Sequence, residues 1–543
     1  MTRTRSGDPD DAVWRSLASS RAFPDDSGAA SGVEWIQTHL SHVYRTAERV
    51  YKFRKPVDFG FVRFASRAER NADCLREVAL NRRLAPDVYL GVAPLRDEAS
   101  GPTVGRWGET LASADAEHCV VMRRLADGRD ALSLLEAGAL GPEHLDGLAA
   151  RIARFHAGTG LGAPAPFPPE AWLLHCTEPV ADNFASLAEA DPRQMPPDAL
   201  ALARERAEAF AANHAGRFER RRRDGRAVDA HGDLHLQHVW YEGDPAEPIA
   251  IDCLEFSDRL RRIDAASEVA FPAMDLRYRG ARGLAERFLR RYARESDDFD
   301  LYAVVDYFAA YRAGVRAKVA ALAARDPQIA AEQRERAAES ARRHVALAAE
   351  VLAPARAGAM VLVCGIVGSG KSSVAEALAE ALEAVVVSSD RVRKRLLGAA
   401  PTDRLAAGWG EGAYSNDRTD PTYAGICARA VPVLASGRIA ILDATWSRAR
   451  HRAEALATAR RLGARAHLVE VRCDREVARE RLARRALAGA DPSDAGPDAL
   501  EPSAAGFEAI DDWPSTPIQV DTSRGGWRGA LGDALAAIRG RVD

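Results

Sequence analysis

A glycine-rich segment contains the residues whose types and spacing most clearly predict chemistry. The segment from Gly365 to Ser372 reads GIVGSGKS, which matches the pattern G-x-x-x-x-G-K-[ST] between an apolar run and a helical pattern. Glycines let backbone N–H groups surround the phosphates of ATP, Lys371 reaches the outer phosphate oxygens, and the Ser372 hydroxyl binds Mg²⁺. A glycine-rich turn can also cap a helix without a ligand, but the lysine and its context favour nucleotide binding. The predicted ATP-binding residues are Gly365, Gly368, Ser369, Gly370, Lys371, Ser372 and Ser373.

Two carboxylates that follow apolar runs could complete a phosphoryl-transfer site. The run IAILD ends in Asp443, so we expect this carboxylate to hold Mg²⁺ through water. The run AVVVSSD ends in Asp390, and ligands collect where parallel strands end. Asp390 is therefore a candidate general base for an acceptor hydroxyl, and Arg393 could steer an anionic group. Both aspartates also suit helix capping, which leaves a structural interpretation open.

An arginine-rich helical pattern follows in RCDREVARERLARRALAG. Such a helix could close over the nucleotide and offer Arg481 or Arg485 to the transferring phosphoryl group, as the lids of kinases do. A charge-rich helix can equally well face only solvent, so spacing alone leaves both interpretations open.

A second group of chemically suited residues lies in the first half of the chain. Phosphoryl transfer needs one carboxylate near the acceptor hydroxyl and another that holds Mg²⁺ on ATP, and these roles suit Asp233 in HGDLHLQH and Asp252 in IDCLEF. It also needs a strand lysine paired with a helix glutamate, which fits Lys52 and Glu77. Only five of the 75 basic residues are lysines, so Lys52 is informative. Lys55 is the alternative, but it precedes a proline, where strands often end.

Histidines at 231, 235 and 238 raise a different possibility, a zinc site. Their spacing matches no zinc signature, and no cysteine or glutamate completes the set. The pattern therefore disfavours zinc and leaves phosphoryl transfer as the main interpretation.

The elements that must position these residues follow two patterns. From Met360 onward, apolar strands alternate with helical segments, which predicts a parallel sheet with crossover helices. Before it, short strands and one helical stretch precede a mainly helical region. The sequence thus predicts two domains, one α+β and one α/β. We place a flexible N-terminal extension over 1–30, the first domain over 31–352, a linker over 353–359 and the second domain over 360–543.

Motifs in both halves resemble kinase families. GxxGSGKS, SSDxVRKxL, ILDAT and the CDxxxxRxRLxxR helix resemble P-loop kinases such as zeta toxins, gluconate kinases and polynucleotide kinases. HGDLHLQH and IDCLEF resemble the aminoglycoside phosphotransferase and choline kinase family, which implies a bilobal protein-kinase-like fold. The order of the halves resembles bacterial bifunctional aminoglycoside phosphotransferase/ATP-binding proteins. In the aminoglycoside phosphotransferase and choline kinase family a metal-binding asparagine ends the loop that matches HGDLHLQH. Here that residue is His238, so the resemblance implies a metal role for an imidazole, a poorer Mg²⁺ ligand.

Composition limits the partners that suit this chain. Its 543 residues are 47% hydrophobic and 28% charged, as expected for globular protein, and the net charge of −3 disfavours a non-specific nucleic-acid binder. The seven cysteines lack CxxC spacing, and no apolar run approaches the roughly 20 residues that cross a bilayer. We therefore expect a cytoplasmic protein without a membrane partner.

Together these features predict an ATP- and Mg²⁺-dependent phosphotransferase with two nucleotide-binding units and a small-molecule hydroxyl acceptor. One alternative, motivated by His238, is a P-loop ATPase regulated by a catalytically silent kinase-like sensor domain. Another is a kinase that acts on nucleotide or polynucleotide 5′-hydroxyls. The run from Arg220 to Arg223 motivates it, although we interpret that run as a solvated helix end.

Overall fold

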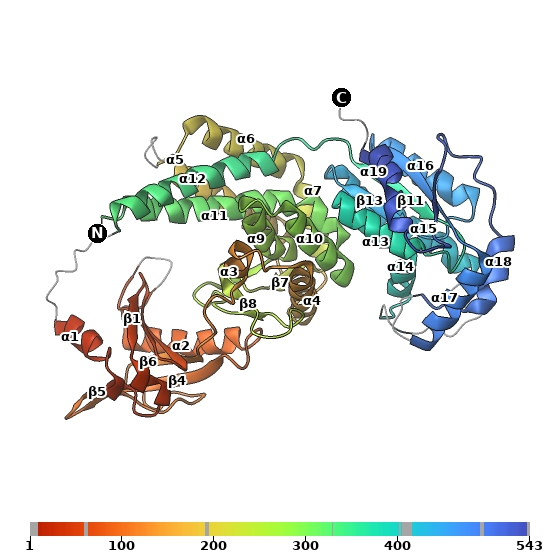
Figure 1. The fold of residues 1–543 in the computed structure, drawn as a ribbon. Helices are drawn as coiled ribbons and strands as arrows, with labels where there is room; N and C mark the ends of the chain where they lie inside the picture. Colours follow the sequence, from red (N-terminus) through yellow and green to blue (C-terminus); the bar gives the residue numbers. More distant parts are fainter. Residues whose placement is uncertain are drawn as a thin grey trace. The chain divides into compact units, whose positions relative to one another are not determined.

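The chain folds into two compact units, one made of residues 1–179 and 218–279, the other of residues 180–217 and 280–543 (Figure 1). The computed structural model describes residues 9–58, 63–189, 195–327, 329–400, 403, 405, 415–488 and 493–539. Within these residues, no helix combines the length and the apolar character that crossing a membrane requires.

An antiparallel sheet of six strands begins the first unit, in the order β1-β2-β3-β6-β4-β5. The strands are β1 (Glu34–Gln37), β2 (Ser41–Arg45), β3 (Arg49–Arg54), β4 (Tyr89–Glu98), β5 (Gly101–Val104) and β6 (His118–Arg123). Helix α2 (Arg67–Asn81) starts at a capping box in which Ser66 and Glu69 bond each other's backbone N–H groups. Its buried face packs on β4 and β6, which places Glu77 of α2 beside the centre of the sheet.

The segment before the sheet is packed, so the prediction of a flexible extension over 1–30 is wrong for residues 9–30. Helix α1 (Pro9–Ser16) and two 3-10 turns (Ser20–Ala22 and Ser27–Ser31) precede β1. Leu17 and Phe23 are almost fully buried against aromatic residues of β2 and β3. The polar composition was misleading because its polar groups are bonded: Asp26 is buried and accepts hydrogen bonds from Thr46 and Tyr51.

Helices and two short strand pairs make up the rest of the first unit. The helices are α3 (Ala131–Glu136), α4 (Pro142–Gly158), α5 (Pro169–Ala188), which runs past the unit's boundary, α7 (Ala215–Arg223), α8 (Asp258–Arg261) and α9 (Ala265–Tyr278). The strand pairs are β7 (Ala227–Asp229) with β10 (Arg262–Asp264), and β8 (Val239–Trp240) with β9 (Ile249–Ala250). They hold the loop that contains Asp233, including the 3-10 turn Leu236–His238, next to Asp252.

Half of the arginine run in α7 is buried, which corrects its interpretation as a solvated helix end. Arg221 is fully buried and makes a bidentate contact with Asp264, with both N–O distances at 2.8 Å. Arg222 is buried as well and pairs with Glu219. These two guanidinium groups already bind carboxylates of the protein itself, so they do not form a surface for the phosphates of a polynucleotide. The arginine run therefore gives little support to polynucleotide binding.

A parallel sheet of five strands forms the second unit's centre, in the order β12-β13-β11-β14-β15, which confirms the predicted α/β class. The strands are β11 (Ala359–Cys364), β12 (Val385–Ser388), β13 (Ile439–Asp443), β14 (Arg465–Arg472) and β15 (Ile518–Asp521). Every residue of β11 is buried, as expected for a central strand covered on both faces. The helices are α13 (Lys371–Leu382), α14 (Ser389–Leu396), α15 (Asn416–Ala435), α16 (Ala449–Arg461), α17 (Arg475–Ala488), α18 (Leu500–Ala505) and α19 (Leu531–Arg539).

The second unit also contains helices that precede the P-loop sequence. They are α6 (Pro197–Asn213), α10 (Arg282–Ser296), the 3-10 turn Phe299–Ala303, α11 (Val305–Arg325) and α12 (Ala331–Val351). Arg438, just before β13, is almost fully enclosed and bonds both Glu286 of α10 and Asp306 of α11 at 2.8 to 3.2 Å. The predicted linker at 353–359 therefore marks the point where the sequence pattern changes. It does not mark the boundary of the compact unit, because α10 and α11 belong to the same unit as the P-loop sheet.

Candidate active sites

The glycine-rich segment forms a tight loop between β11 and α13. Gly365, Gly368 and Gly370 all have φ in the left-handed region, at 146°, 76° and 88°. A Cβ atom at Gly365 would lie 2.4 Å from the Val471 carbonyl oxygen, and one at Gly368 would lie 2.8 Å from that of Ala478. The backbone can follow this path only with glycine, which explains the pattern at these positions.

Lys371, Ser372 and Asp443 meet beneath the loop. The Lys371 ammonium is enclosed and donates a hydrogen bond to the Ile366 carbonyl at 2.8 Å, and burial lowers the pKa of this lysine. The Ser372 hydroxyl donates to Asp443. Burial raises the pKa of Asp443 to about 6, although Lys371 and Ser372 oppose the shift. A hydroxyl and a carboxylate side by side are the oxygen donors that Mg²⁺ prefers, so this pair suits a nucleotide-bound Mg²⁺.

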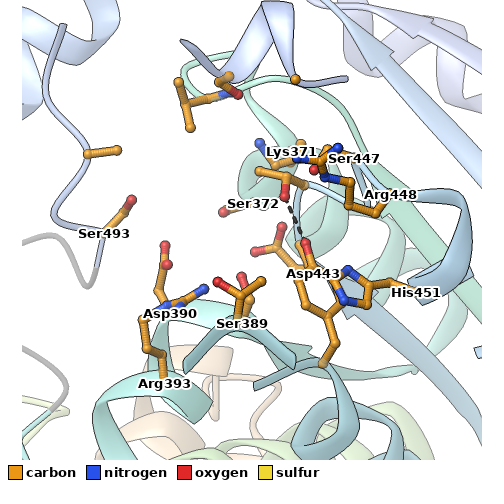
Figure 2. A pocket seen from close by; sticks show the side chains of 18 of the residues that line it. Lys371, Ser372, Ser389, Asp390, Arg393, Asp443, Ser447, Arg448, His451 and Ser493 are labelled. Atoms are coloured by element: carbon orange, nitrogen blue, oxygen red, sulfur yellow. Dashed lines mark hydrogen bonds between the residues drawn. The ribbon is translucent and has the colours of Figure 1, made fainter. Parts of the chain in front are cut away.

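Asp390 faces the same space from the first turn of α14. The parallel pairing of β12 with β13 sets Ser388 opposite Asp443, which brings the ends of both strands together. Burial raises the pKa of Asp390, while Arg393 and a hydrogen bond from Ser493 oppose the shift. Figure 2 shows Lys371, Asp390 and Asp443 around one cavity of about 240 Å³.

Basic side chains from the segment after β13 also line this cavity, and sequence reasoning missed them. They are Arg450 and, as Figure 2 shows, Arg448 and His451. The His451 ring is buried and stacks on Tyr423 at 4.0 Å, with its Nε2 atom 2.9 Å from Asp420. Its Nδ1 atom has no hydrogen-bond partner among the described residues. A sequence signal for these residues was available, because they follow shortly after a strand that ends in the candidate metal ligand Asp443.

The arginine-rich helix α17 contributes to the site in two ways. Arg485 lines the cavity and donates to the Ala495 carbonyl at 2.9 Å. Arg481 lies beside Gly370 and donates to the hydroxyl and carbonyl of Thr522, at 3.0 and 2.6 Å, so it already has strong partners. Neither arginine is merely solvent-facing. Residues 489–492 of the predicted lid loop lie outside the described residues.

A buried lysine also escaped the sequence analysis of this site. Lys394 is 1% exposed, and its ammonium lies 3.2 Å from the carboxylate of Asp494, which belongs to the loop after α17. The scarcity of lysine in this chain was the signal that could have identified it.

The first unit has a second charged site on its sheet. Lys52 of β3 lies 2.9 Å from Glu77 of α2 and 2.9 Å from Asp252, which follows β9. Lys52 holds the pKa of Asp252 well below its usual range. Burial lowers the pKa of Lys52, but the charges of Asp252 and Glu77 outweigh burial, so the net pKa is raised. The structure thus brings together the three residues that the sequence predicted to act together.

A buried arginine that the sequence analysis missed supports this group. Arg54, two residues after Lys52 on β3, contacts Glu77 at 2.6 Å, Asp73 at 2.7 Å and Glu255 at 2.5 Å. Burial raises the pKa of Glu255 to about 7, although Arg54 opposes the shift. Glu77 therefore remains paired with a cation even without Lys52.

The loop of Asp233 adds three histidines with different surroundings. His231 is structural: its Nε2 atom lies 2.8 Å from the Ile251 carbonyl, and burial lowers its pKa to about 3. Glu268 anchors the loop by accepting from the N–H groups of His231 and Gly232. Asp233, His235 and His238 place one ligand atom each within 4.8 Å of the others, so the fold brings together a group of possible metal ligands that the sequence spacing did not indicate.

Comparisons with known proteins match both halves of the chain. The AAA domain family matches residues 360–510. The uncharacterized proteins Rv2004c of Mycobacterium tuberculosis and Mb2027c of Mycobacterium bovis are each 32% identical to this chain over 459 residues. That alignment covers 84% of this chain and 86% of each relative.

Three solved structures are similar to parts of the chain. A gluconokinase from Sinorhizobium meliloti is 22% identical and covers 34% of this chain and 93% of its own, with a TM-score of 0.25. A choline/ethanolamine kinase family protein from Mesorhizobium loti is 15% identical and covers 63% and 99%, with a TM-score of 0.35. The amicoumacin kinase hAmiN is 14% identical and covers 62% and 92%, also at 0.35. The strand orders and directions described above define the two folds independently of these overlaps.

Proposed function

The chain belongs to the same family as the mycobacterial proteins Rv2004c and Mb2027c, and from that premise we propose that its second unit is an ATP-dependent phosphotransferase. The observation that carries the proposal is the convergence of Lys371, Ser372, Asp443 and Asp390 on one cavity beside a glycine-rich loop. These groups supply a cation for the phosphates, oxygen donors for a metal ion and a carboxylate for the acceptor.

Each group has a role in the proposed reaction. Backbone N–H groups of the loop and the Lys371 ammonium hold the phosphates of ATP. Ser372 and Asp443 would hold Mg²⁺, which when bound neutralises charge on the transferring phosphoryl group. Asp390 accepts the proton of the acceptor hydroxyl, and its raised pKa makes it a stronger base than an exposed aspartate. Arg485 places a further positive charge on the cavity wall.

We further propose that the acceptor is a small molecule carrying a negative charge as well as a hydroxyl. The cavity of about 240 Å³ also has to admit the phosphates of ATP beside Lys371, so the space left for the acceptor suits only a small molecule. Arg393, Arg448 and Arg450 line it, and the Nδ1 atom of His451 is an unused hydrogen-bonding group in its wall. Arg448 pairs with Glu508 at 3.1 Å and Arg450 with Asp420 at 2.7 Å, so these arginines do not depend on a ligand for a charge partner. A carboxylate or phosphate on the acceptor would be attracted by the positive charge that they and Arg393 place on the cavity wall, whereas a neutral alcohol would gain little from it.

For the first unit we propose nucleotide binding through Lys52, Glu77 and Asp252, with Asp233 placed for an acceptor hydroxyl. A catalytically silent sensor is the second candidate function for this unit. It is favoured by one observation: the imidazoles of His238 and His235 lie 3.5 Å and 3.8 Å from the Asp233 carboxylate, so they take up part of the space that an acceptor hydroxyl would need beside it.

The acceptor proposal can be tested with paired substrates. Polyols are compared with the corresponding sugar acids and sugar phosphates as acceptors for the full chain with ATP and Mg²⁺, by mass gain of one phosphate. We expect the anionic member of a productive pair to react at least about tenfold faster, a difference of about 1.4 kcal/mol. Arg393→Gln should remove the preference, while Arg395→Gln, on the same helix but largely exposed, should keep it. Equal rates for both members of each pair would contradict the charge argument.

The transfer chemistry has its own test, Asp390→Asn. Loss of the base should lower transfer to the acceptor by about 10² to 10⁴-fold while ATP binding stays within about threefold. Retained transfer in this variant would reject Asp390 as the base.

A further inference from the structure

The metal position of the first unit departs from what its kinase-like fold implies. Such a fold implies Mg²⁺ held by oxygen ligands beside the ATP phosphates. Asp252 fits that requirement, but the other candidate ligand is the imidazole of His238, a nitrogen donor that hard Mg²⁺ disfavours. We propose that this site takes a divalent first-row transition-metal ion, bound by the Nε2 atom of His238 and the Oδ2 atom of Asp252. The inference rests on the proposed nucleotide binding by the first unit.

The hydrogen bonding of His238 fixes which nitrogen is available. Its Nδ1 atom lies 2.9 Å from the main-chain carbonyl oxygen of Asp233, which can only accept, so Nδ1 carries the proton. The neutral ring then has its lone pair on Nε2. Metal-bound histidines commonly use this arrangement, in which the second ring nitrogen donates to a backbone carbonyl and fixes the orientation of the ring.

The two carboxylate oxygens of Asp252 have different partners. Oδ1 receives the Lys52 ammonium at 2.9 Å, whereas Oδ2 lies 3.6 Å from His238 Nε2. That separation is too long for a hydrogen bond. It does match two ligands of one ion, because atoms each about 2.1 Å from a tetrahedral metal lie roughly 3.4 Å apart. The Lys52 contact also keeps Asp252 in place, with a backbone φ of 62° that few non-glycine residues adopt.

The neighbouring combination of Asp233, His235 and His238 is a weaker candidate. The nearest nitrogen of His238 to the Asp233 carboxylate is Nδ1, the atom that carries the proton. The His235 ring packs against that of His238 at an interplanar angle of 34°, with centroids 3.8 Å apart, and is 5% exposed. His235 thus serves as the matched control: a histidine of the same loop, beside the site, that the proposal does not use.

Electron paramagnetic resonance of Mn²⁺ tests the proposal without measuring activity. The full chain carries Lys371→Ala to weaken nucleotide binding at the P-loop, and Mn²⁺ is added with a non-hydrolysable ATP analogue. Pulsed spectra should show the ¹⁴N modulation of a directly bound imidazole. That signal should vanish in His238→Asn and persist in His235→Asn. We also expect the excess of Mg²⁺ needed to displace Mn²⁺ to fall at least about tenfold in His238→Asn, because an amide oxygen suits Mg²⁺.

Three results of this experiment would contradict the inference. Nucleotide-dependent Mn²⁺ binding without ¹⁴N modulation in the chain with an intact His238 overturns the inference, whatever the folding of the variants. Loss of the modulation in His235→Asn but not in His238→Asn overturns it as well. Absence of nucleotide-dependent Mn²⁺ binding in the Lys371→Ala chain rejects both the inference and the nucleotide site of the first unit, and leaves the proposed function of the second unit intact.

Discussion

Lys371 is a half-buried lysine whose ammonium donates, among the described residues, to a backbone carbonyl of its own loop. Burial of a charge costs free energy that bound phosphates would offset, so we expect Lys371→Ala to lower ATP turnover by at least about 10²-fold, as for other preorganised charge contacts. Phosphate release by the full chain measures this. Lys318→Ala is the control, because Lys318 lies in the same unit and bonds Asn183, and neither residue lines the cavity. Comparable losses in both variants would indicate a general effect on folding instead.

The pKa of Asp443 predicts how nucleotide binding depends on pH. Burial raises this pKa to about 6, and only the ionised carboxylate serves as a metal ligand. As pH falls through 6 the carboxylate takes up a proton that binding must release, so affinity for Mg²⁺·ATP should fall by about tenfold per pH unit well below that value. Above it the dependence should flatten.

Calorimetry between pH 4.5 and 8 measures that dependence. The phosphates of ATP titrate in the same range, so Asp443→Asn supplies the reference slope of the nucleotide alone. Identical slopes for the two proteins would refute the assigned role of Asp443.

The residues that sequence motifs could identify are those whose roles are local in the chain. The glycines and Lys371 follow from the geometry of one loop, and Asp443 from the end of one strand. His451 could not be identified this way, because its importance comes from stacking on Tyr423 of another helix. Arg54 was missed for the same reason: its three carboxylate partners lie on α2 and beyond β9.

At the scale of elements, helix α10 contacts the elements around the P-loop, although the sequence analysis placed its residues in the first domain. Its last turn lies beside the helix that follows the P-loop: Arg294 contacts Glu376 of α13 at 2.6 Å. Glu295 contacts Arg391, the neighbour of Asp390, at 3.2 Å. Arg294 also lines a cavity of about 570 Å³ together with Lys371 and Asp390.

This arrangement predicts that Arg294 supports phosphoryl transfer. Arg294→Ala should lower kcat by at least about tenfold, because it removes a positive charge from the cavity wall and leaves Glu376 to repel the phosphates. Arg287 is a close control, since it connects the same two helices through Glu380 at 3.3 Å but does not line the cavity. Arg287→Ala should change kcat by less than about twofold. Equal losses in phosphate release would show that Arg294 acts only by holding the helices together.

Element types were predictable wherever one face or one strand was uniformly apolar. The five strands of the second unit are parallel as expected, and the central strand β11 is buried along its whole length. Residues 9–30 were not predictable, because their few apolar side chains are spaced by polar groups that find partners only in the folded sheet. The placement of α10 and α11 in the second unit likewise rests on contacts between residues far apart in the sequence. One example is Arg438, whose two carboxylate partners lie more than 130 positions away.

At the scale of the whole molecule, the two charged sites lie in different compact units and share no residue. We therefore expect one chain to bind two equivalents of nucleotide, one at each site. Calorimetric titration with a non-hydrolysable ATP analogue and a divalent metal should give two equivalents for the unmodified chain and one for Lys371→Ala. Lys52→Met should also give one, since Arg54 continues to neutralise Glu77 and the fold should persist. The double variant should bind none. A single equivalent in the unmodified chain, lost on changing Lys371 and unaffected at Lys52, would instead show that the first unit binds no nucleotide and would favour its role as a sensor of another ligand.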